Sequence, residues 1–219
     1  MQRYLKEIAP MPLFKGVDEK DLPDLLRCLG GYLKTFKKNE IIYLESQEIH
    51  AVGVVLSGAV HMIKEDIDGE KTLLVSIKVG EVFGESFACG SRKDARVSFV
   101  AVSPCVLLFL PFQKVMHSCS NSCVFHSRLI ENTVRIMCDK NVMLMNKLEV
   151  VSKKTLRDKI LCYLHIEAQH QGKNRFTIPF GRSELAEYLC ANRSALSREL
   201  SLMKKENRID FHKNTFTLY

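Results

Sequence analysis

Residues 182–200, RSELAEYLCANRSALSREL, have the spacing of two short amphipathic helices joined by a tight turn. Asn192 stands where a helix N-cap belongs, so the second helix is expected to begin at Arg193. Each half of the stretch carries apolar residues at helical spacing, which allows the two helices to pack against each other. These residues are Leu185, Ala186 and Leu189 in the first half and Leu196, Leu200 and Met203 in the second. The pattern predicts a helix-turn-helix.

The second helix of this pair places hydrogen-bonding side chains away from its buried leucines. An arginine can donate two hydrogen bonds to guanine O6 and N7, and a helix that presents arginine in its first turn suits the major groove. The alternative is an ordinary helix pair with a solvated basic face. We interpret the motif as sequence-specific for DNA. The residues expected to contact DNA are Arg193, Ser194, Ser197 and Arg198, together with Arg182 and Lys204.

The positive charge of the chain is concentrated around this motif. The 219 residues carry 32 Lys and Arg against 25 Asp and Glu, a formal net charge of +7. Residues 151–219 hold 13 Lys and Arg against 7 Asp and Glu, which accounts for nearly the whole excess. A basic excess confined to one segment is expected of a surface that contacts phosphates.

The composition indicates a globular cytoplasmic protein. A chain of 219 residues, 46% of them hydrophobic, is long enough for one large or two modest domains. We expect neither export nor a membrane span, because there is no signal-peptide pattern and Pro104 and Pro111 interrupt the most apolar stretch, residues 101–112. The eight cysteines are therefore interpreted as reduced thiols.

The N-terminal half changes from helical to strand-like periodicity. Residues 18–29 predict a short helix with Asp18 as its N-cap. Residues 32–112 contain short apolar runs separated by turn residues, with hairpin turns expected at Gly58 and at the Asp68-Gly69 pair. Many short strands at close spacing favour an antiparallel sandwich or barrel. The predicted strands are YLKTF, EIIYL, AVGVVL, AVHMI, TLLVSI, VSFVAV and CVLLFL.

Helical periodicity returns near Ser122, and its heptad seam predicts a dimerisation helix. The seam residues are Ile130, Val134, Met137, Asn141, Leu144 and Leu148. A second apolar row leaves open packing along the helix's own domain, so we expect one face on the β-domain and the other on a partner chain. That row consists of Leu129, Ile136, Met143 and Val150.

The periodicity changes divide the chain into three predicted domains. Residues 1–121 form a β-domain with an N-terminal helix, residues 122–150 form the dimerisation helix, and residues 151–219 form the DNA-binding domain. The chain ends in RIDFHKNTFTLY, whose alternation around residues 213–214 predicts a terminal hairpin, or wing, beside the helix-turn-helix.

This order of parts resembles the Crp/Fnr family of bacterial transcription regulators. The residues that carry the resemblance are the SGAV turn at residues 57–60, Asp68-Gly69, the Gly80-x-x-x-Gly84-Glu85-Ser86 segment and the 182–200 motif. The resemblance covers nearly the whole chain. It implies an α+β fold with a jelly-roll-like antiparallel β-roll as sensor domain, a long dimerisation helix and a winged helix-turn-helix. It also implies a homodimer that binds a pseudo-palindromic operator on double-stranded DNA and contacts RNA polymerase.

The resemblance also implies a small effector in the β-roll. In members that bind cyclic AMP, a Gly-Glu pair holds the ribose, and Gly84 and Glu85 match it. The Arg-Ser pair that holds the phosphate falls on Ala95-Arg96, so the arginine is displaced by one position, which in a strand turns it to the opposite face. The hydroxyl pair that contacts the base falls on Lys140 and Asn141. We therefore expect an unknown effector other than cyclic AMP, unless the β-roll is only structural. The expected effector-binding residues are Gly84, Glu85, Ser86, Arg96, Lys140 and Asn141.

Two residues of the DNA-binding motif depart from the family pattern. Arg193 and Arg198 match the two arginines that read guanines, but the glutamate between them is Ser194, so the operator is expected to share only part of the usual half-site. Cys190 stands where the family usually has glycine. If the backbone is left-handed there, the cysteine costs about 1 kcal/mol, and we expect a strained turn that the fold tolerates.

Cysteine and histidine residues near the start of the long helix suggest an alternative, a redox- or metal-responsive regulator. His117, Cys119, Cys123 and His126 have suitable ligand types but lack a short Cys-x2-Cys spacing, so no metal site is assigned. Only Cys28 lies early in the chain, so we expect no iron-sulfur cluster of the family's oxygen-sensing kind.

A further alternative is a cupin-like metal enzyme. The β-zone offers His50 and His61 without a His-x-His pair, and it shows no nucleophile with an adjacent base. We therefore predict that the chain is not an enzyme.

Overall fold

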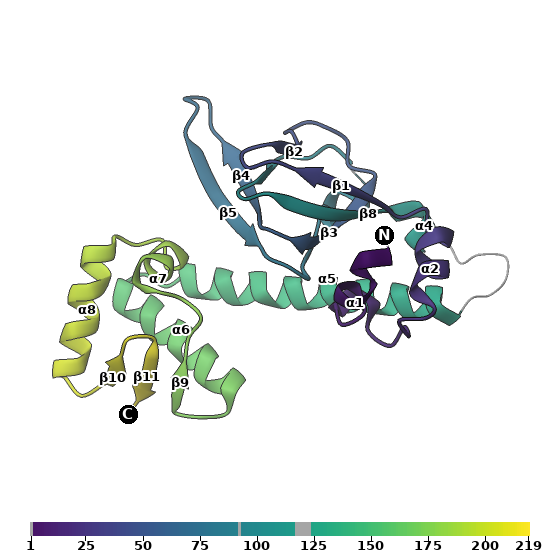
Figure 1. The fold of residues 1–219 in the computed structure, drawn as a ribbon. Coiled ribbons are helices and arrows are strands. Elements are labelled where there is room, and N and C mark those ends of the chain that lie inside the picture. The colour runs from purple at the N-terminus through teal and green to yellow at the C-terminus, as the bar shows by residue number, and fades with distance from the viewer. Residues whose placement is uncertain (1, 92, 117–123) are drawn as a thin grey trace. The chain divides into compact units, whose positions relative to one another are not determined.

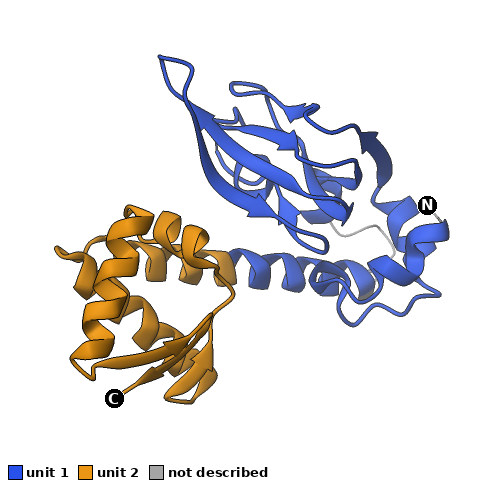
Figure 2. Ribbon diagram, turned by 60° about the vertical axis from the view of Figure 1, so that its left-hand side comes forward, with its two compact units in different colours: residues 1–137 blue, residues 138–219 orange. Residues whose placement is uncertain are grey.

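A computed structural model describes residues 2–91, 93–116 and 124–219 (Figure 1). The chain divides into two compact units, residues 1–137 and residues 138–219, and the division lies within helix α5 (Val124–Val151) (Figure 2). The first unit combines β-sheets with short helices, and the second combines helices with a small sheet. The predicted α+β class is confirmed.

Short helices open the N-terminal unit, and their apolar side chains join its core. Helix α2 starts later than the sequence predicts, with Asp21 rather than Asp18 at the N-cap position. The reason is local: Asp21 N–H donates to the Asp18 carbonyl at 2.9 Å, closing a turn, and Pro23 then occupies the first helical turn, where proline is favoured. The elements are η1 (Gln2–Tyr4), α1 (Leu5–Ile8), η2 (Pro12–Phe14) and α2 (Leu22–Cys28).

Two antiparallel four-stranded sheets form the body of this unit, with strand orders β1-β8-β3-β6 and β2-β7-β4-β5. Each predicted apolar run overlaps one of the strands, so the jelly-roll-like β-domain is confirmed. Only β6 has no predicted counterpart, because two residues are too few to show an alternation. The strands are β1 (Tyr32–Phe36), β2 (Ile41–Tyr43), β3 (Ala51–Ser57), β4 (Val60–Glu65), β5 (Lys71–Ile77), β6 (Val82–Phe83), β7 (Ser98–Ala101) and β8 (Cys105–Pro111).

The two predicted hairpin turns have different outcomes. Asp68-Gly69 joins β4 to β5, which pair within one sheet, and Gly69 has a φ of 83°. The hairpin at Gly58 is wrong, because Gly58 leads from β3 in one sheet to β4 in the other. A side chain at Gly58 has no room, since a Cβ there would lie 2.4 Å from the Pro104 carbonyl oxygen.

Phenylalanine rings fill the space between the two sheets. The Phe83 ring centroid lies 5.3 Å from that of Phe99 and 6.1 Å from that of Phe109, so one ring joins strands of both sheets. Gly53 on β3 admits the Phe83 ring, because a Cβ at Gly53 would lie 2.2 Å from it.

The first half of α5 is anchored in the N-terminal unit. The Asn132 side-chain amide donates to the carbonyls of Leu13 at 3.0 Å and Lys15 at 2.8 Å. Leu129 is fully buried in the core of the unit. The N-terminal segment and α5 are therefore tied together by hydrogen bonds and packing. Two short helices, α3 (Glu85–Ala88) and α4 (Phe112–Met116), complete the unit.

The C-terminal unit begins with the end of α5 and continues into α6 (Leu156–Gln171), whose N-cap Thr155 accepts a hydrogen bond from Asp158 N–H at 3.1 Å. The predicted terminal hairpin is present. A third strand, which the sequence did not predict, pairs with the hairpin in the order β10-β11-β9. The remaining elements are β9 (Arg175–Thr177), α7 (Arg182–Tyr188), α8 (Arg193–Lys205), β10 (Ile209–His212) and β11 (Thr215–Leu218).

Candidate DNA-binding surface

Helices α7 and α8 form the predicted helix-turn-helix, and the six apolar residues of the motif are all buried in one core. Gly181 N–H donates to the Glu184 carboxylate at 2.7 Å, which satisfies a free backbone group at the start of α7. The predicted N-cap of α8 is confirmed, because the Asn192 side-chain oxygen accepts a hydrogen bond from Ser194 N–H at 2.9 Å.

The turn between the two helices holds Cys190 in a left-handed conformation, with a φ of 50°. Cys190 N–H donates to the Glu187 carbonyl at 3.1 Å, and Ala191 N–H donates to the Ala186 carbonyl at 2.9 Å. These bonds satisfy the last carbonyls of α7 as a glycine C-cap does. The expectation of a strained but tolerated turn is confirmed.

The exposed face of α8 carries the predicted base-reading residues in two rows. Arg193 and Ser197 are one turn apart, and so are Ser194 and Arg198; all four side chains are exposed. Among the described residues, Arg198 makes only long contacts within the helix, 3.4 Å to the Ser194 carbonyl and 3.5 Å to the Ser194 hydroxyl. The guanidinium can therefore exchange these contacts for a base edge.

Arg182 and Lys204, also expected at the DNA surface, both contact the wing, the hairpin of β10 and β11. The Arg182 guanidinium lies 4.7 Å from the ring centroid of Phe211 and donates to the Lys213 carbonyl at 3.1 Å. Its partial burial lowers the pKa of this guanidinium. Lys204 forms an ion pair with Asp210. Both cations thus position the wing beside α8, a role that the sequence did not suggest.

The Arg157 side chain of α6 joins that helix to α8. It donates to Glu199 at 2.6 Å and, through its two terminal nitrogens, to Glu206 at 2.7 Å and 3.0 Å. These hydrogen bonds hold the pKa of Glu206 below its usual range. Glu199 in α8 and Glu206 at its C-cap thus face α6, where Arg157 neutralises them. Neither carboxylate lies among the four exposed polar residues of α8.

Two lysines hold the C-terminal end of α7. Lys147 on α5 donates to the Tyr188 carbonyl, and its ammonium lies 3.9 Å from the centroid of the Tyr188 ring. Lys159 on α6 donates to the Leu189 carbonyl at 3.4 Å. Cations at a helix C-terminus are favourable because they satisfy carbonyls that lack intrahelical partners. Burial lowers the pKa of Lys147.

Comparison with known protein families follows the same division into two parts. The cyclic nucleotide-binding domain family matches residues 33–122, and the Crp-like helix-turn-helix domain family matches residues 159–218. The chain belongs to the Crp/Fnr family. It is thus a Crp/Fnr-type, DNA-binding transcription regulator. The sequence matches no curated protein.

Solved structures of other Crp/Fnr regulators share the fold. A structure described as CprK complexed with OCPA has a TM-score of 0.67 and 17% identity, over 90% of this chain and 91% of that one. A CooA mutant from Carboxydothermus hydrogenoformans has a TM-score of 0.60 and 18% identity, over 89% and 85%. DNR from Pseudomonas aeruginosa has a TM-score of 0.51 and 18% identity, over 100% and 95%.

The six expected effector-binding residues differ in burial, and they are divided between the two units. Gly84, with a φ of 79°, and Glu85 are buried where β6 leads into α3, whereas Ser86 is exposed. Ala95 is 1% exposed, and Arg96 beside it is exposed. The one-residue displacement therefore turns alanine inward and arginine outward. Lys140 is half-buried and Asn141 exposed, both on the part of α5 that belongs to the other unit.

The heptad seam of α5 is exposed over its middle and end. Leu144 and Leu148 are each 66% exposed, Val134 and Asn141 are also exposed, and Ile130 and Met137 are half-buried. In the second apolar row, Leu129 and Val150 are buried in the cores of their own units and Ile136 packs against the core of the first, but Met143 is exposed. Large exposed apolar side chains along one helix are characteristic of an interaction surface.

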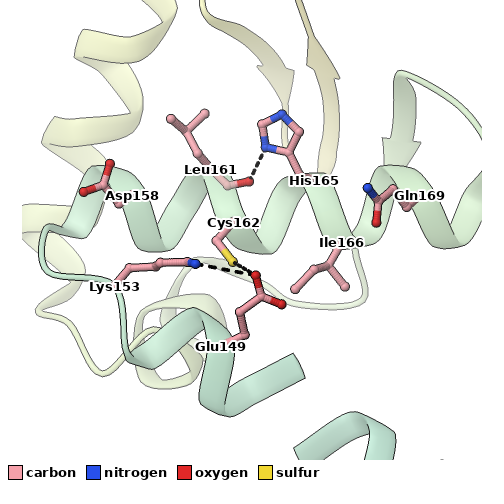
Figure 3. Close-up of a pocket in the computed structure, with 8 residues that line it drawn as sticks. All are labelled: Glu149, Lys153, Asp158, Leu161, Cys162, His165, Ile166 and Gln169. Atoms are coloured by element: carbon pink, nitrogen blue, oxygen red, sulfur yellow. Dashed lines mark hydrogen bonds and ion pairs between the residues drawn. The ribbon is translucent and has the colours of Figure 1, made fainter. Parts of the chain in front are cut away.

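A groove of about 420 Å³ lies between the end of α5 and α6 in the C-terminal unit (Figure 3). Glu149 lies in it, accepting from the Cys162 thiol at 3.6 Å and pairing with Lys153 at 3.5 Å. His165 contacts the Leu161 carbonyl at 2.7 Å. Burial and the Glu149 carboxylate raise the pKa of the Cys162 thiol, so this cysteine is kept protonated rather than reactive.

The predicted cysteine-histidine constellation is only partly within the described residues. His117, Cys119 and Cys123 lie outside them, whereas His126 is buried in the first turn of α5. The described part of the chain contains no group of three or more His, Cys, Asp or Glu side chains that could hold a metal. Among the same residues, no helix is long and apolar enough to cross a membrane.

Proposed function

We propose that the protein acts as a homodimer that binds a two-fold symmetric DNA site and responds to a small effector other than cyclic AMP. The observation that carries the proposal is the exposed polar face of α8. A capped helix presents Arg193, Ser194, Ser197 and Arg198 to solvent, and its acidic residues are engaged by Arg157 on another side. Such a helix is suited to the major groove.

The exposed seam of α5 supports the homodimer. Val134, Leu144 and Leu148 are apolar and exposed at heptad spacing, and a second copy would cover them. In a dimer with two-fold symmetry, the two α8 helices read half-sites about 34–36 Å apart, one turn of DNA. Contact with RNA polymerase follows from the family resemblance and is part of the same proposal.

The surroundings of Gly84 and Ala95 support the choice of effector. The Gly84-Glu85 pair is buried as a ligand-binding element would be. The cyclic phosphate would lack its arginine, however, because Ala95 occupies the buried position and Arg96 is exposed. An unpaired phosphate in a buried site is strongly unfavourable. The proposed effector is therefore one that does not need this arginine.

The deciding experiment is selection of duplex DNA from a random pool by the purified, reduced protein without added ligand. Recovery of a two-fold symmetric site is expected, with half-sites one or more helical turns apart. The half-site is expected to differ from the family's usual one at the base pair that Ser194 faces. Recovery of only sequence-random DNA, whose binding disappears with salt, would mean either that the dimer needs its effector for specific binding or that α8 is a basic surface and does not read bases. Repetition of the selection with cyclic AMP is expected to give the same result.

A further inference from the structure

Arg182, the first residue of α7, packs against the wing with both ends of its guanidinium. The guanidinium lies 4.7 Å from the ring centroid of Phe211 on β10 and 5.3 Å from that of Phe216 on β11. Its Nη2 atom donates to the Lys213 carbonyl at 3.1 Å. Its Nη1 atom is buried and has no hydrogen-bond partner among the described residues. While the wing stays in place, Arg182 therefore cannot offer a phosphate the paired nitrogens with which an arginine usually binds one.

The carbonyl that Arg182 binds belongs to the turn of the wing. Only Lys213 and Asn214 connect β10 to β11, and Lys213 has a φ of 51°, a left-handed conformation that is uncommon outside glycine. A hydrogen bond to the carbonyl of this residue fixes the peptide group that follows it, and so favours this conformation over others. The Lys213 side chain is exposed. Arg182 thus holds the turn in the conformation that presents the Lys213 ammonium to solvent.

Lys204 anchors the first strand of the wing and is itself neutralised there. It forms an ion pair with Asp210, and this contact lowers the pKa of the Asp210 carboxyl. Its ammonium also lies 5.2 Å from the ring centroid of Phe211. Among the described residues, by contrast, no carboxylate forms an ion pair with the exposed Lys213 ammonium. Of these three cations around the wing, Lys213 is therefore the one best placed to bind a phosphate.

We propose that Arg182 is a positioning residue for DNA binding, which holds the turn of the wing so that Lys213 contacts a backbone phosphate beside the groove that α8 enters. The wing follows α8 directly in the chain (Figure 1), and the Lys204–Asp210 ion pair joins the two. Phosphate contacts fix the register and orientation of a protein on the duplex. The inference rests on the proposed DNA contact of α8, and it gives Arg182 an indirect role in place of a direct one.

The test compares the full-length wild type with Arg182→Lys, Lys213→Ala and the double variant. Each is titrated with a duplex of fixed arbitrary sequence at several salt concentrations, because phosphate contacts do not depend on sequence. Lys213→Ala is expected to reduce the slope of log binding constant against log salt concentration by about 0.9 per protomer, and to weaken binding about five- to tenfold per protomer at about 0.1 M salt.

Arg182→Lys keeps the charge but not the planar group that contacts both rings and the turn, so a loss of similar size is expected. The double variant is expected to bind within about twofold of either single variant, because both substitutions remove the same contact. Arg175→Lys is the matched control, since Arg175 is an exposed arginine on β9 of the same sheet, and it is expected to bind as the wild type does.

Two binding results would overturn the proposal. Wild-type affinity and salt slope in Arg182→Lys would do so, because a lysine retains a direct phosphate contact. Losses that multiply in the double variant would also do so, because independent contacts contribute additive free energies. This titration needs neither base reading nor an effector. Failure of the proposed function would appear separately, as the absence of a specific site in the DNA selection.

Hydrogen exchange distinguishes the positioning role from a general effect on stability. Arg182→Lys is expected to speed exchange of the amides of β10 and β11 and to leave those of α8 unchanged. Faster exchange throughout the unit, or unchanged exchange in the wing, would overturn the role. Arg182→Met keeps a long side chain against the rings and is the second variant, with circular dichroism to show that both fold. It is expected to match Arg182→Lys and to cause no further loss beside Lys213→Ala.

Discussion

The guanidinium of Arg157 donates two hydrogen bonds to the carboxylate of Glu206, at 2.7 Å and 3.0 Å, and so connects α6 to the C-cap of α8. This pairing keeps the pKa of Glu206 below its usual range. A carboxylate whose pKa is lower in the folded state stabilises that state above the unfolded pKa. The stabilisation is lost as the pH falls through the lower, folded value.

The stability of the C-terminal unit is therefore expected to depend on Glu206 at neutral pH and not in acid. Glu206→Gln is expected to lower the melting temperature at pH 7, and its difference from wild type is expected to shrink below about pH 4. Thermal unfolding followed by circular dichroism from pH 7 to pH 3 measures this. Glu187→Gln, another exposed glutamate, is the control. A difference that grows as the pH falls would contradict the pairing.

The Asn192 cap is expected to stabilise α8. Asn192→Ala removes the oxygen that accepts from Ser194 N–H, and it is expected to destabilise the unit by about 1 kcal/mol. Asn192→Asp retains an acceptor and is the control. Hydrogen exchange of the α8 amides measures the change locally. Equal exchange in Asn192→Ala and wild type would mean that the cap does not stabilise the helix.

The left-handed backbone at Cys190 predicts a stabilising substitution. Cys190→Gly is expected to raise stability by up to about 1 kcal/mol, because glycine adopts a positive φ without strain. Cys190→Ala removes the thiol but keeps the Cβ, so it is expected to give no such gain. Chemical denaturation of the three proteins separates the backbone effect from an effect of sulfur. A gain in Cys190→Ala equal to that in Cys190→Gly would assign the penalty to the thiol.

Features that depend on neighbouring residues in the sequence, such as strands, helix caps and turns, were largely predictable. Short apolar runs located seven strands of the N-terminal unit, and alternation predicted the terminal hairpin of β10 and β11. The Asn192 cap followed from residue type and position, whereas the left-handed turn at Cys190 was expected from the family resemblance. The expected outward displacement of Arg96 agrees with its exposure beside the buried Ala95, although both residues precede β7 and do not lie in a strand.

Non-local relationships were not predictable in this way. The contact of Arg182 with the wing and that of Lys147 with Tyr188 depend on how helices and the wing pack, which no periodicity in the sequence records. The contact of Cys28 Sγ with His126 Nε2, at 4.0 Å, joins positions 98 residues apart. The sequence pattern had grouped His126 with cysteines near it in the chain, whereas the described structure brings it to a cysteine of α2.

The exposed seam of α5 predicts that a single charge disrupts the dimer. Leu144→Glu places a carboxylate on the apolar row, where pairing would bury it without a partner, and it is expected to shift the protein towards monomer. Arg135→Glu introduces the same side chain at an exposed position on the opposite face of the helix and is expected to leave the assembly unchanged. Sedimentation equilibrium measures both. A Leu144→Glu protein with the wild-type mass would argue against this seam.

Base reading and phosphate contact can be distinguished by how a substitution changes sequence specificity. Arg198→Ala removes a candidate guanine contact, so it is expected to weaken binding to the selected site by about 1–3 kcal/mol and to relax the choice at one base pair. Lys205→Ala removes an exposed charge at the end of α8, so a phosphate contact there would weaken binding about equally on all sequences and make it less dependent on salt. Titration of each variant on the selected site and its single-base mutants measures both effects. If Arg198→Ala weakened all sequences alike, Arg198 would be a phosphate contact, and base reading would fall to Arg193 and the two serines.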